Sequence, residues 1–183
     1  MPAIPIISQK NTIALPPVLG IRKHILSDEA ETRFFGERFS KALVITRLEH
    51  IHTLNGLQIQ LLGDLGIGKT TFVRAILRGL GYQDRIRSPT YTLLEPYVFE
   101  REDRKFEIYH FDLYRFNELF EWSDVGFREY FNSNTICLIE WPQKASVLLG
   151  IPDLIFLFDF DGNRRTLTII AYSALGKIYL ERC

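Results

Sequence analysis

The eight residues from Gly63 to Thr70 read Gly-Asp-Leu-Gly-Ile-Gly-Lys-Thr and fit the pattern G-x-x-x-x-G-K-[ST]. Glycines allow a loop backbone to close around phosphate oxygens, with several N–H groups pointing inward. In such a loop Lys69 reaches the β- and γ-phosphates, and the hydroxyl of Thr70 holds Mg²⁺. The motif also needs a strand before it and a helix after it, because the helix N-terminus must face the phosphates.

Both flanks of the loop meet this requirement. The stretch Leu57–Leu62 alternates apolar and polar residues and then becomes fully apolar, as does a strand that enters a sheet. Gly81 stands where a C-cap glycine would end the helix after the loop. The residues with helical apolar spacing in that segment are Phe72, Val73, Ile76, Leu77 and Leu80. We therefore expect a phosphate-binding loop and not a glycine-rich turn that binds nothing.

Length and composition indicate one domain. The chain has 183 residues and is 46% apolar, enough for a packed core. We expect residues 1–24, which hold several prolines, to form an irregular N-terminal extension, and residues 25–183 to form a single P-loop ATPase domain. No apolar stretch approaches the length of about 18 residues that a membrane helix needs. The two cysteines, Cys137 and Cys183, suit neither a zinc site nor a disulfide framework and favour a cytoplasmic location.

The remaining elements follow from periodicity and turn signals. A helix is expected from the N-cap Ser27 to about Leu43. The pattern of the residues after Leu43 does not distinguish a short strand from the end of the helix. The pair His50 and His52 is interpreted as solvated loop histidines more readily than as metal ligands. The other expected elements are strands at 93–98, 106–112, 135–141, 154–160 and 165–172, a helical stretch over 117–132 and a short strand at 177–181. This order predicts an α/β fold, a P-loop NTPase-like mixed sheet with covering helices and antiparallel hairpins at one edge.

Two acids end predicted strands, where a doubly wound sheet presents its ligand site. Asp112 ends the strand that begins near residue 106, and Glu140 closes an apolar run in the manner of a Walker B strand. Such acids can organise Mg²⁺ or orient an attacking water. His110 would share the face of Asp112, and a structural, hydrogen-bonded role is favoured for it over a catalytic one. The alternative for both acids is that they only mark the exit of a strand into solvent.

Other polar groups could assist the phosphate site. The segment 88–91 reads Ser-Pro-Thr-Tyr, with hydroxyls at Ser88 and Thr90, and lies where P-loop proteins often carry a γ-phosphate-sensing switch. An ordinary proline turn is the alternative. Arg87, Arg115 and Arg165 are possible charge stabilisers, although the sequence does not rank them.

Four blocks in this order resemble the TsaE family, formerly YjeE. They are GDLGIGKTTFVRAIL at 63–77, RSPTYTLLEPY at 87–97, YHFDLYR at 109–115 and CLIEWP at 137–142. The resemblance covers roughly residues 25–175. It implies an ATP- or ADP-binding protein with Mg²⁺ that hydrolyses ATP weakly alone. It also implies a partner, the threonylcarbamoyl-transferase pair of TsaD and TsaB family proteins, which acts on adenosine 37 of ANN-decoding tRNAs. Contact with tRNA would be through that complex, and the zero net charge of the chain predicts no general attraction to nucleic acid or membrane.

The resemblance also assigns residues by position. It matches Lys69 to the lysine that binds phosphate and Asp112 to an acid essential for hydrolysis. Thr70 and Glu140 match the residues associated with Mg²⁺. Trp141 follows Glu140, as a tryptophan does in the family. The nucleotide-binding set is Gly63, Asp64, Leu65, Gly66, Ile67, Gly68, Lys69, Thr70, Thr71, Thr90, and near the adenine Glu29 and Thr32. The chain departs from the family pattern in its N-terminal extension, in a longer segment 43–55 and in the run 164–166, where the family's arginine is hard to align.

Three other functions were compared with an accessory ATPase. A stand-alone small-molecule kinase would need an acceptor pocket and an arginine-bearing lid, for which residues 101–104 are the candidate. A GTPase switch would need Asn-Lys-x-Asp and Asp-x-x-Gly motifs, and the sequence has neither in a suitable place. The last alternative is a nucleotide-gated assembly module whose hydrolysis is incidental.

Overall fold

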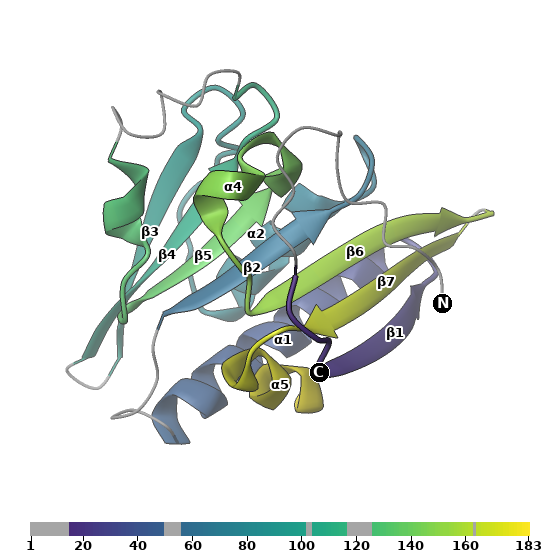
Figure 1. Ribbon diagram of the computed structural model, residues 1–183, viewed down its shortest axis with the longest axis horizontal. Helices are drawn as coiled ribbons and strands as arrows, with labels where there is room; N and C mark the ends of the chain where they lie inside the picture. Colours follow the sequence, from purple (N-terminus) through teal and green to yellow (C-terminus); the bar gives the residue numbers. More distant parts are fainter. Residues whose placement is uncertain (1–14, 50–55, 102–103, 117–125, 163) are drawn as a thin grey trace.

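The computed structural model describes residues 15–49, 56–101, 104–116, 126–162 and 164–183 (Figure 1). Some of the predictions concern residues outside these ranges. The histidine pair His50 and His52 and residues 117–125 of the expected helical stretch lie outside the described residues.

The described part of the chain builds one mixed sheet with strand order β1-β7-β6-β2-β5-β4-β3 (Figure 1). The strands are β1 Gly20–Leu26, β2 Leu57–Leu62, β3 Leu94–Arg101, β4 Arg104–Asp112, β5 Thr135–Glu140, β6 Leu154–Asp161 and β7 Arg164–Ala171. Strand β2 pairs in parallel with β5 and β6, and β4 pairs in parallel with β5. The predicted mixed sheet is confirmed. Antiparallel pairing was expected at one edge and is present at both, because the parallel strands separate the hairpin β3–β4 from the hairpin β6–β7, which pairs with β1.

Strand β1 corrects the expected irregular extension at residues 20–24, whereas residues 1–14 lie outside the described residues. It pairs antiparallel with β7 along its whole length, from Gly20 opposite Ala171 to Leu26 opposite Arg165. Its side chains alternate between half-buried and exposed until Leu26, which is buried. The prolines before β1 suggested irregular structure. A distant strand, β7, supplies the hydrogen bonds that order this segment.

Two long helices cover one face of the sheet. Helix α1 spans Glu29–Glu49 and packs along α2, Lys69–Gly79. The predicted start is off by one residue, because the carboxylate of Asp28, and not Ser27, accepts the N–H of Glu31 at 2.9 Å and caps the first turn. The helix also continues past Leu43. None of the helices that the structure describes is both long and apolar enough to cross a membrane.

Aromatic packing fixes α2 and with it the loop that precedes it. The ring of Phe72 on α2 lies 6.1 Å from that of Phe35 on α1, and 5.2 and 5.6 Å from those of Phe156 and Phe158 on β6. Phe72 is fully buried. The start of α2 is therefore held between α1 and the centre of the sheet.

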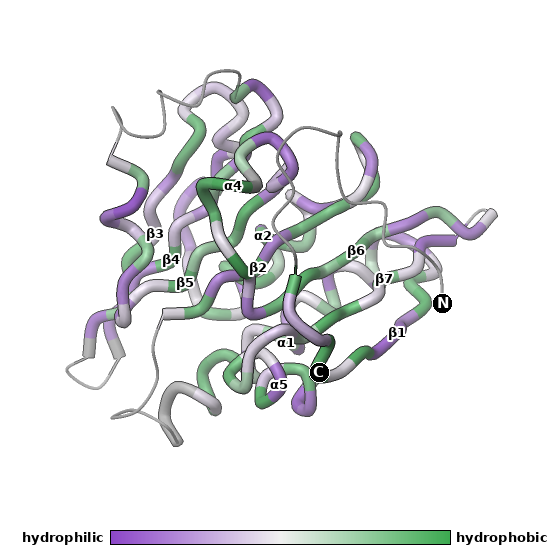
Figure 2. Tube along the Cα trace, viewed as in Figure 1, coloured by the Kyte–Doolittle hydropathy of each residue, from purple (hydrophilic) through white to green (hydrophobic). Residues whose placement is uncertain are grey.

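A thinner layer covers the other face, where α4 lies in front of the sheet in Figure 1. It consists of two 3₁₀ turns and α4: η1 Phe127–Tyr130, η2 Pro142–Lys144 and α4 Ser146–Leu149. Phe127 of η1 and Leu149 of α4 share a hydrophobic cluster with Cys137 and Ile139 of β5. Figure 2 shows apolar colour along β6 giving way to mostly hydrophilic residues at the tip of the β6–β7 hairpin.

The last element is a helix, α5 Ala174–Glu181, where the sequence predicted a strand at 177–181. The side chain of Ser173 caps it by accepting the N–H of Gly176 at 2.9 Å, and its hydroxyl donates to the carboxylate of Asp153. Gly176, Tyr179 and Leu180 are buried at helical spacing, and α5 packs on β7 and β1. The short apolar run resembled a strand because its helical periodicity covers barely two turns.

We expect Ser173→Ala to lower the free energy of unfolding by about 1 kcal/mol, since the helix loses its N-cap acceptor. Urea unfolding followed by circular dichroism measures this change. The control is Ser133→Ala, which removes an exposed hydroxyl from a loop. Equal stability of the two variants would contradict the capping role of Ser173.

Candidate active site

The loop between β2 and α2 has a backbone that favours glycine at three positions. Gly63, Gly66 and Gly68 have φ angles of 139, 77 and 115°, in the region that L side chains rarely adopt. A Cβ at Gly63 would also lie 2.7 Å from the carbonyl oxygen of Phe158. No described side chain caps the first turn of α2, so its N–H groups remain available to an anion.

Lys69 lies at the centre of this loop and is 4% exposed. Its ammonium donates to the carbonyl oxygens of Gly63 at 2.6 Å and Asp64 at 2.8 Å, and it lies 4.1 Å from the centre of the Trp141 ring. Burial lowers the pKa of Lys69, while the carboxylates of Glu140, Asp112 and Asp64 oppose that shift. The three carboxylates favour the charged form of this lysine, and a buried ammonium at a glycine-rich loop is suited to binding phosphate oxygens.

Glu140 ends β5 and connects the loop to the adjacent strand. Its Oε2 accepts the hydroxyl of Thr70 at 3.0 Å, and its Oε1 lies 2.8 Å from Nε2 of His110 on β4. The carboxylate is 2% exposed. The next residue, Trp141, has a left-handed backbone with φ 57°, which is rare for a large side chain and turns the chain sharply beside the loop.

Asp112 lies beside Glu140, because the two residues are register partners on β4 and β5. Its Oδ2 accepts the hydroxyl of Thr90 at 2.7 Å, and its Oδ1 accepts the N–H of Tyr114 at 3.1 Å. Since the Thr90 proton is directed to Asp112, the hydroxyl of Ser88, 3.0 Å away, donates to Thr90. A chain of hydroxyls thus runs from the exposed Ser88 to the 4% exposed Asp112.

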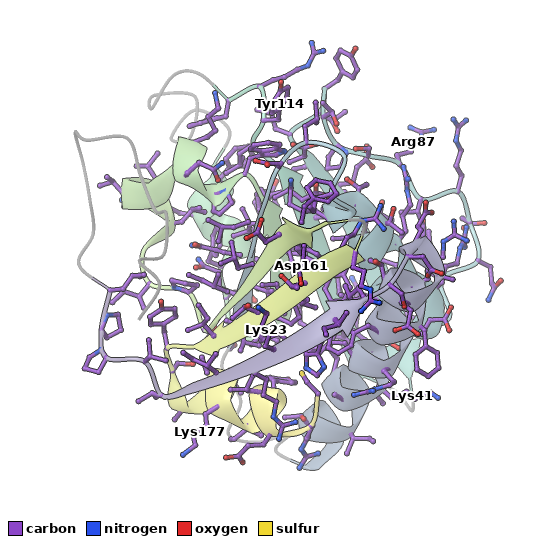
Figure 3. All side chains as sticks on the ribbon, turned by 90° about the vertical axis from the view of Figure 1, so that its right-hand side faces the viewer. Lys23, Lys41, Arg87, Tyr114, Asp161 and Lys177 are labelled. Atoms are coloured by element: carbon purple, nitrogen blue, oxygen red, sulfur yellow. The ribbon has the colours of Figure 1, made fainter. Side chains whose placement is uncertain are left out.

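These groups line one pocket of about 180 Å³ at the carboxyl ends of β2, β4 and β5. In Figure 3 the pocket residue Tyr114 lies at the end of the molecule opposite Lys177 of α5. The lining residues are Leu65, Gly66, Gly68, Lys69, Thr70, Thr71, Thr90, Asp112, Tyr114, Glu140 and Trp141. The predicted residues with side chains capable of chemistry, Lys69, Thr70, Asp112 and Glu140, therefore meet in one place.

The donor set is appropriate for Mg²⁺ held jointly by protein and phosphate. Thr70 Oγ1 and Glu140 Oε2 are hard oxygen ligands that lie 3.0 Å apart on the pocket wall. Mg²⁺ usually takes one or two carboxylates together with phosphate oxygens and waters, and seldom uses a dedicated all-protein cage. Within the described ranges, no group of three or more His, Cys, Asp and Glu side chains could hold a metal on its own.

The other predicted nucleotide residues are placed around the loop. Ile67 is buried beneath it. Thr32 on α1 lies beside it, with Cγ2 3.7 Å from where a Cβ of Gly68 would be, but its hydroxyl donates to the Asp28 carbonyl. Glu29 is exposed and paired with Arg33. Neither Glu29 nor Thr32 lines the pocket, and their contact with adenine stays a prediction.

The structure separates the three candidate arginines. Arg165 on β7 lies beside the loop, with Nε 4.0 Å from where a Cβ of Gly68 would be, and that buried atom has no hydrogen-bond partner among the described residues. Arg115 instead stacks on the exposed ring of Tyr91 at 4.2 Å. Arg87 is exposed.

Sequence reasoning did not single out Tyr114 as a pocket residue. It lies in the block YHFDLYR, two residues after Asp112, but only the structure shows its role: the Tyr114 N–H donates to Asp112, and its ring lies 4.9 Å from that of Trp141. The partner of His110, Glu140, was also unknown from the sequence, because the two residues are on different strands.

A larger cavity of about 360 Å³ lies at the opposite, amino ends of β2 and β5. The residues that line it include Phe131, Asn132 and Cys137, and Cys137 supplies its only ionisable side chain among the described residues. Burial raises the pKa of Cys137 to about 12, which disfavours the reactive thiolate form. Cys137 therefore serves as a small buried hydrophobe, and the polar and ionisable side chains are concentrated in the smaller pocket at the loop.

Comparison with known proteins gives one consistent result. Residues 26–167 match the family described as threonylcarbamoyl adenosine biosynthesis protein TsaE. A protein of Haemophilus influenzae named tRNA threonylcarbamoyladenosine biosynthesis protein TsaE is 40% identical over 152 residues, which cover 83% of this chain and 90% of that protein. A protein of the same name from Rickettsia prowazekii is 37% identical over 148 residues, which cover 80% of this chain and 92% of the relative.

A solved structure is similar as well. The crystal structure of YdiB from Bacillus subtilis superposes with a TM-score of 0.63 at 25% identity, and the match covers 88% of this chain and 93% of YdiB. The Bacillus subtilis protein named tRNA threonylcarbamoyladenosine biosynthesis protein TsaE is 38% identical over 121 residues, which cover 66% of this chain and 72% of that protein.

Proposed function

This chain belongs to the TsaE family, and we propose that it is the ATP-binding and ATP-hydrolysing accessory subunit required for N6-threonylcarbamoyladenosine at position 37 of ANN-decoding tRNAs. The observation that carries the proposal is the convergence of Lys69, Thr70, Asp112 and Glu140 on one pocket beneath a glycine-rich loop. The names of the relatives connect this family to tRNA threonylcarbamoyladenosine biosynthesis.

Each group in the pocket has a proposed task. The loop N–H groups and Lys69 bind the phosphates of ATP or ADP, and Thr71 continues this contact at the start of α2. Thr70 and Glu140 hold Mg²⁺, which when bound neutralises charge that develops on the phosphates. Asp112, held by Thr90 and the Tyr114 N–H, orients the attacking water.

The proposed partner is the threonylcarbamoyl-transferase pair of TsaD and TsaB family proteins. The chain has zero net charge, so its own field does not attract tRNA, and tRNA contact is assigned to the complex. We place the protein in the cytoplasm; both of its cysteines are free thiols, as a reducing compartment requires.

The test is steady-state ATP hydrolysis by the protein alone and mixed with the two-protein transferase. We expect slow hydrolysis alone and clear stimulation in the mixture, after subtraction of hydrolysis by the transferase pair without this chain. Turnover that is indifferent to the partner would contradict the accessory role. It would instead favour a stand-alone small-molecule kinase, and the next step would be a screen for phosphoryl acceptors.

A further inference from the structure

We propose that His110 is a positioning residue that holds the Glu140 carboxylate in the orientation needed beside Thr70 for Mg²⁺. The inference rests on the proposed nucleotide site and adds to it a residue outside the pocket. Nε2 of His110 lies 2.8 Å from Oε1 of Glu140, and both side chains are buried, with exposed fractions of 0% and 2%.

The sheet register explains how His110 reaches Glu140. On the paired strands β4 and β5, Asp112 is the partner of Glu140 and His110 is the partner of Leu138. Residues two apart on a strand share a face, so His110 meets Glu140 diagonally and lies one pleat behind Asp112. His110 is absent from the described pocket lining. It therefore acts on the site through Glu140 and not by touching nucleotide.

The two carboxylate oxygens of Glu140 have separate partners, and only one of these partners, Thr70, has a second proposed role in the pocket. The hydroxyl of Thr70 donates to Oε2 in this structure, but its oxygen is also the proposed Mg²⁺ ligand. The bond from His110 to Oε1 involves no pocket group other than Glu140. A glutamate has three side-chain torsions, and this fixed bond restricts them before and after nucleotide binds.

Only one of the two ring nitrogens of His110 has a hydrogen-bond partner among the described residues. A carboxylate accepts hydrogen bonds, so Nε2 carries the donated proton. Nδ1 is buried and has no hydrogen-bond partner among the described residues. If this position only filled the core, an apolar side chain would fill it without the cost of a buried, unpaired nitrogen. The hydrogen bond from His110 to Glu140 is what an apolar side chain could not supply.

Two substitutions separate positioning from core filling. In His110→Gln the amide nitrogen can occupy the place of Nε2, whereas in His110→Asn the shorter side chain places it near Nδ1, away from Glu140. The readout is the ratio of ADP affinity with Mg²⁺ to ADP affinity in EDTA, measured by calorimetry. We expect His110→Gln to keep the wild-type ratio and His110→Asn to lower it about tenfold, with affinity in EDTA unchanged.

The matched control is His24→Asn on β1, a second histidine with a buried unpaired ring nitrogen that lies outside the pocket. It should keep the wild-type ratio. A wild-type ratio in His110→Asn, or an equal loss in both His110 variants, would overturn the inference. Failure of the wild-type protein to bind ADP under either condition would contradict the proposed function itself.

A measurement on the unmodified protein covers the case in which a variant does not fold. Nitrogen-15 spectra of the histidine side chains report which ring nitrogen carries a proton. We expect His110 to carry a proton at Nε2. A proton at Nδ1 alone would overturn the inference whatever the variants do.

Discussion

Lys69→Ala should abolish tight nucleotide binding, with the affinity for ADP reduced about 100-fold or more, since charge-assisted bonds to phosphate contribute roughly 1.5–3 kcal/mol each. The buried ammonium now rests on the carbonyls of Gly63 and Asp64 and against Trp141, so it is already within the pocket. Alanine removes the point charge that the phosphates would bind. The measurement is calorimetric titration with ADP in EDTA.

Lys41→Ala is the matched control, because Lys41 is an exposed lysine on α1 that Figure 3 shows projecting away from Tyr114. It should bind ADP as the wild type does. Unchanged ADP affinity in Lys69→Ala would refute the assignment of residues 63–70 as a phosphate-binding loop.

Glu140→Ala should leave ADP bound but lower Mg²⁺-dependent hydrolysis of ATP about 100-fold, the usual effect of removing one group that stabilises the transition state. The phosphates keep Lys69 and the loop N–H groups, so binding persists. Mg²⁺ would lose the carboxylate that lies beside the Thr70 hydroxyl on the pocket wall. The measurement is single-turnover hydrolysis at saturating ATP over a range of Mg²⁺ concentrations.

Glu140→Ala also leaves His110 without its acceptor, and a buried unpaired donor lowers stability. Glu140→Gln is therefore tested beside it, because the amide keeps the shape and an acceptor oxygen but not the negative charge. Thermal midpoints show whether each variant is folded at the assay temperature, and Glu181→Ala on α5 controls for loss of an exposed acid. Wild-type turnover in both variants would leave Glu140 as a structural acid at a strand end.

The glycine-rich loop and its flanking elements were predictable because their determinants are local. Strand β2, the loop and α2 are contiguous in sequence, and each has a signal of its own: alternation, glycine at fixed spacing and helical periodicity. The acids Asp112 and Glu140 were also predictable, because parallel strands deliver their last residues to one edge of a sheet.

The errors occur where a segment depends on partners distant in sequence. Strand β1 is ordered by β7, about the whole length of the domain away, and α5 takes its cap contact from Asp153 and its packing from β7. In segments this short, the hydrophobic pattern repeats too few times to distinguish a strand from a helix. The placement of the two hairpins depended likewise on pairing that no local pattern encodes.

The sequence by itself determined the composition of the candidate site: a loop with the phosphate-binding pattern, its lysine and threonine, and two strand-end acids, all set by residue type at short spacing. Only the tertiary structure decided how those groups meet. In the folded chain the hydroxyl of Thr90 donates to Asp112, and His110 is hydrogen-bonded to Glu140. The fold also places Arg165 beside the loop, whereas Arg115 stacks on Tyr91. The physical reason is that side-chain contacts across a sheet depend on strand order and register, which arise from burial summed over the whole chain.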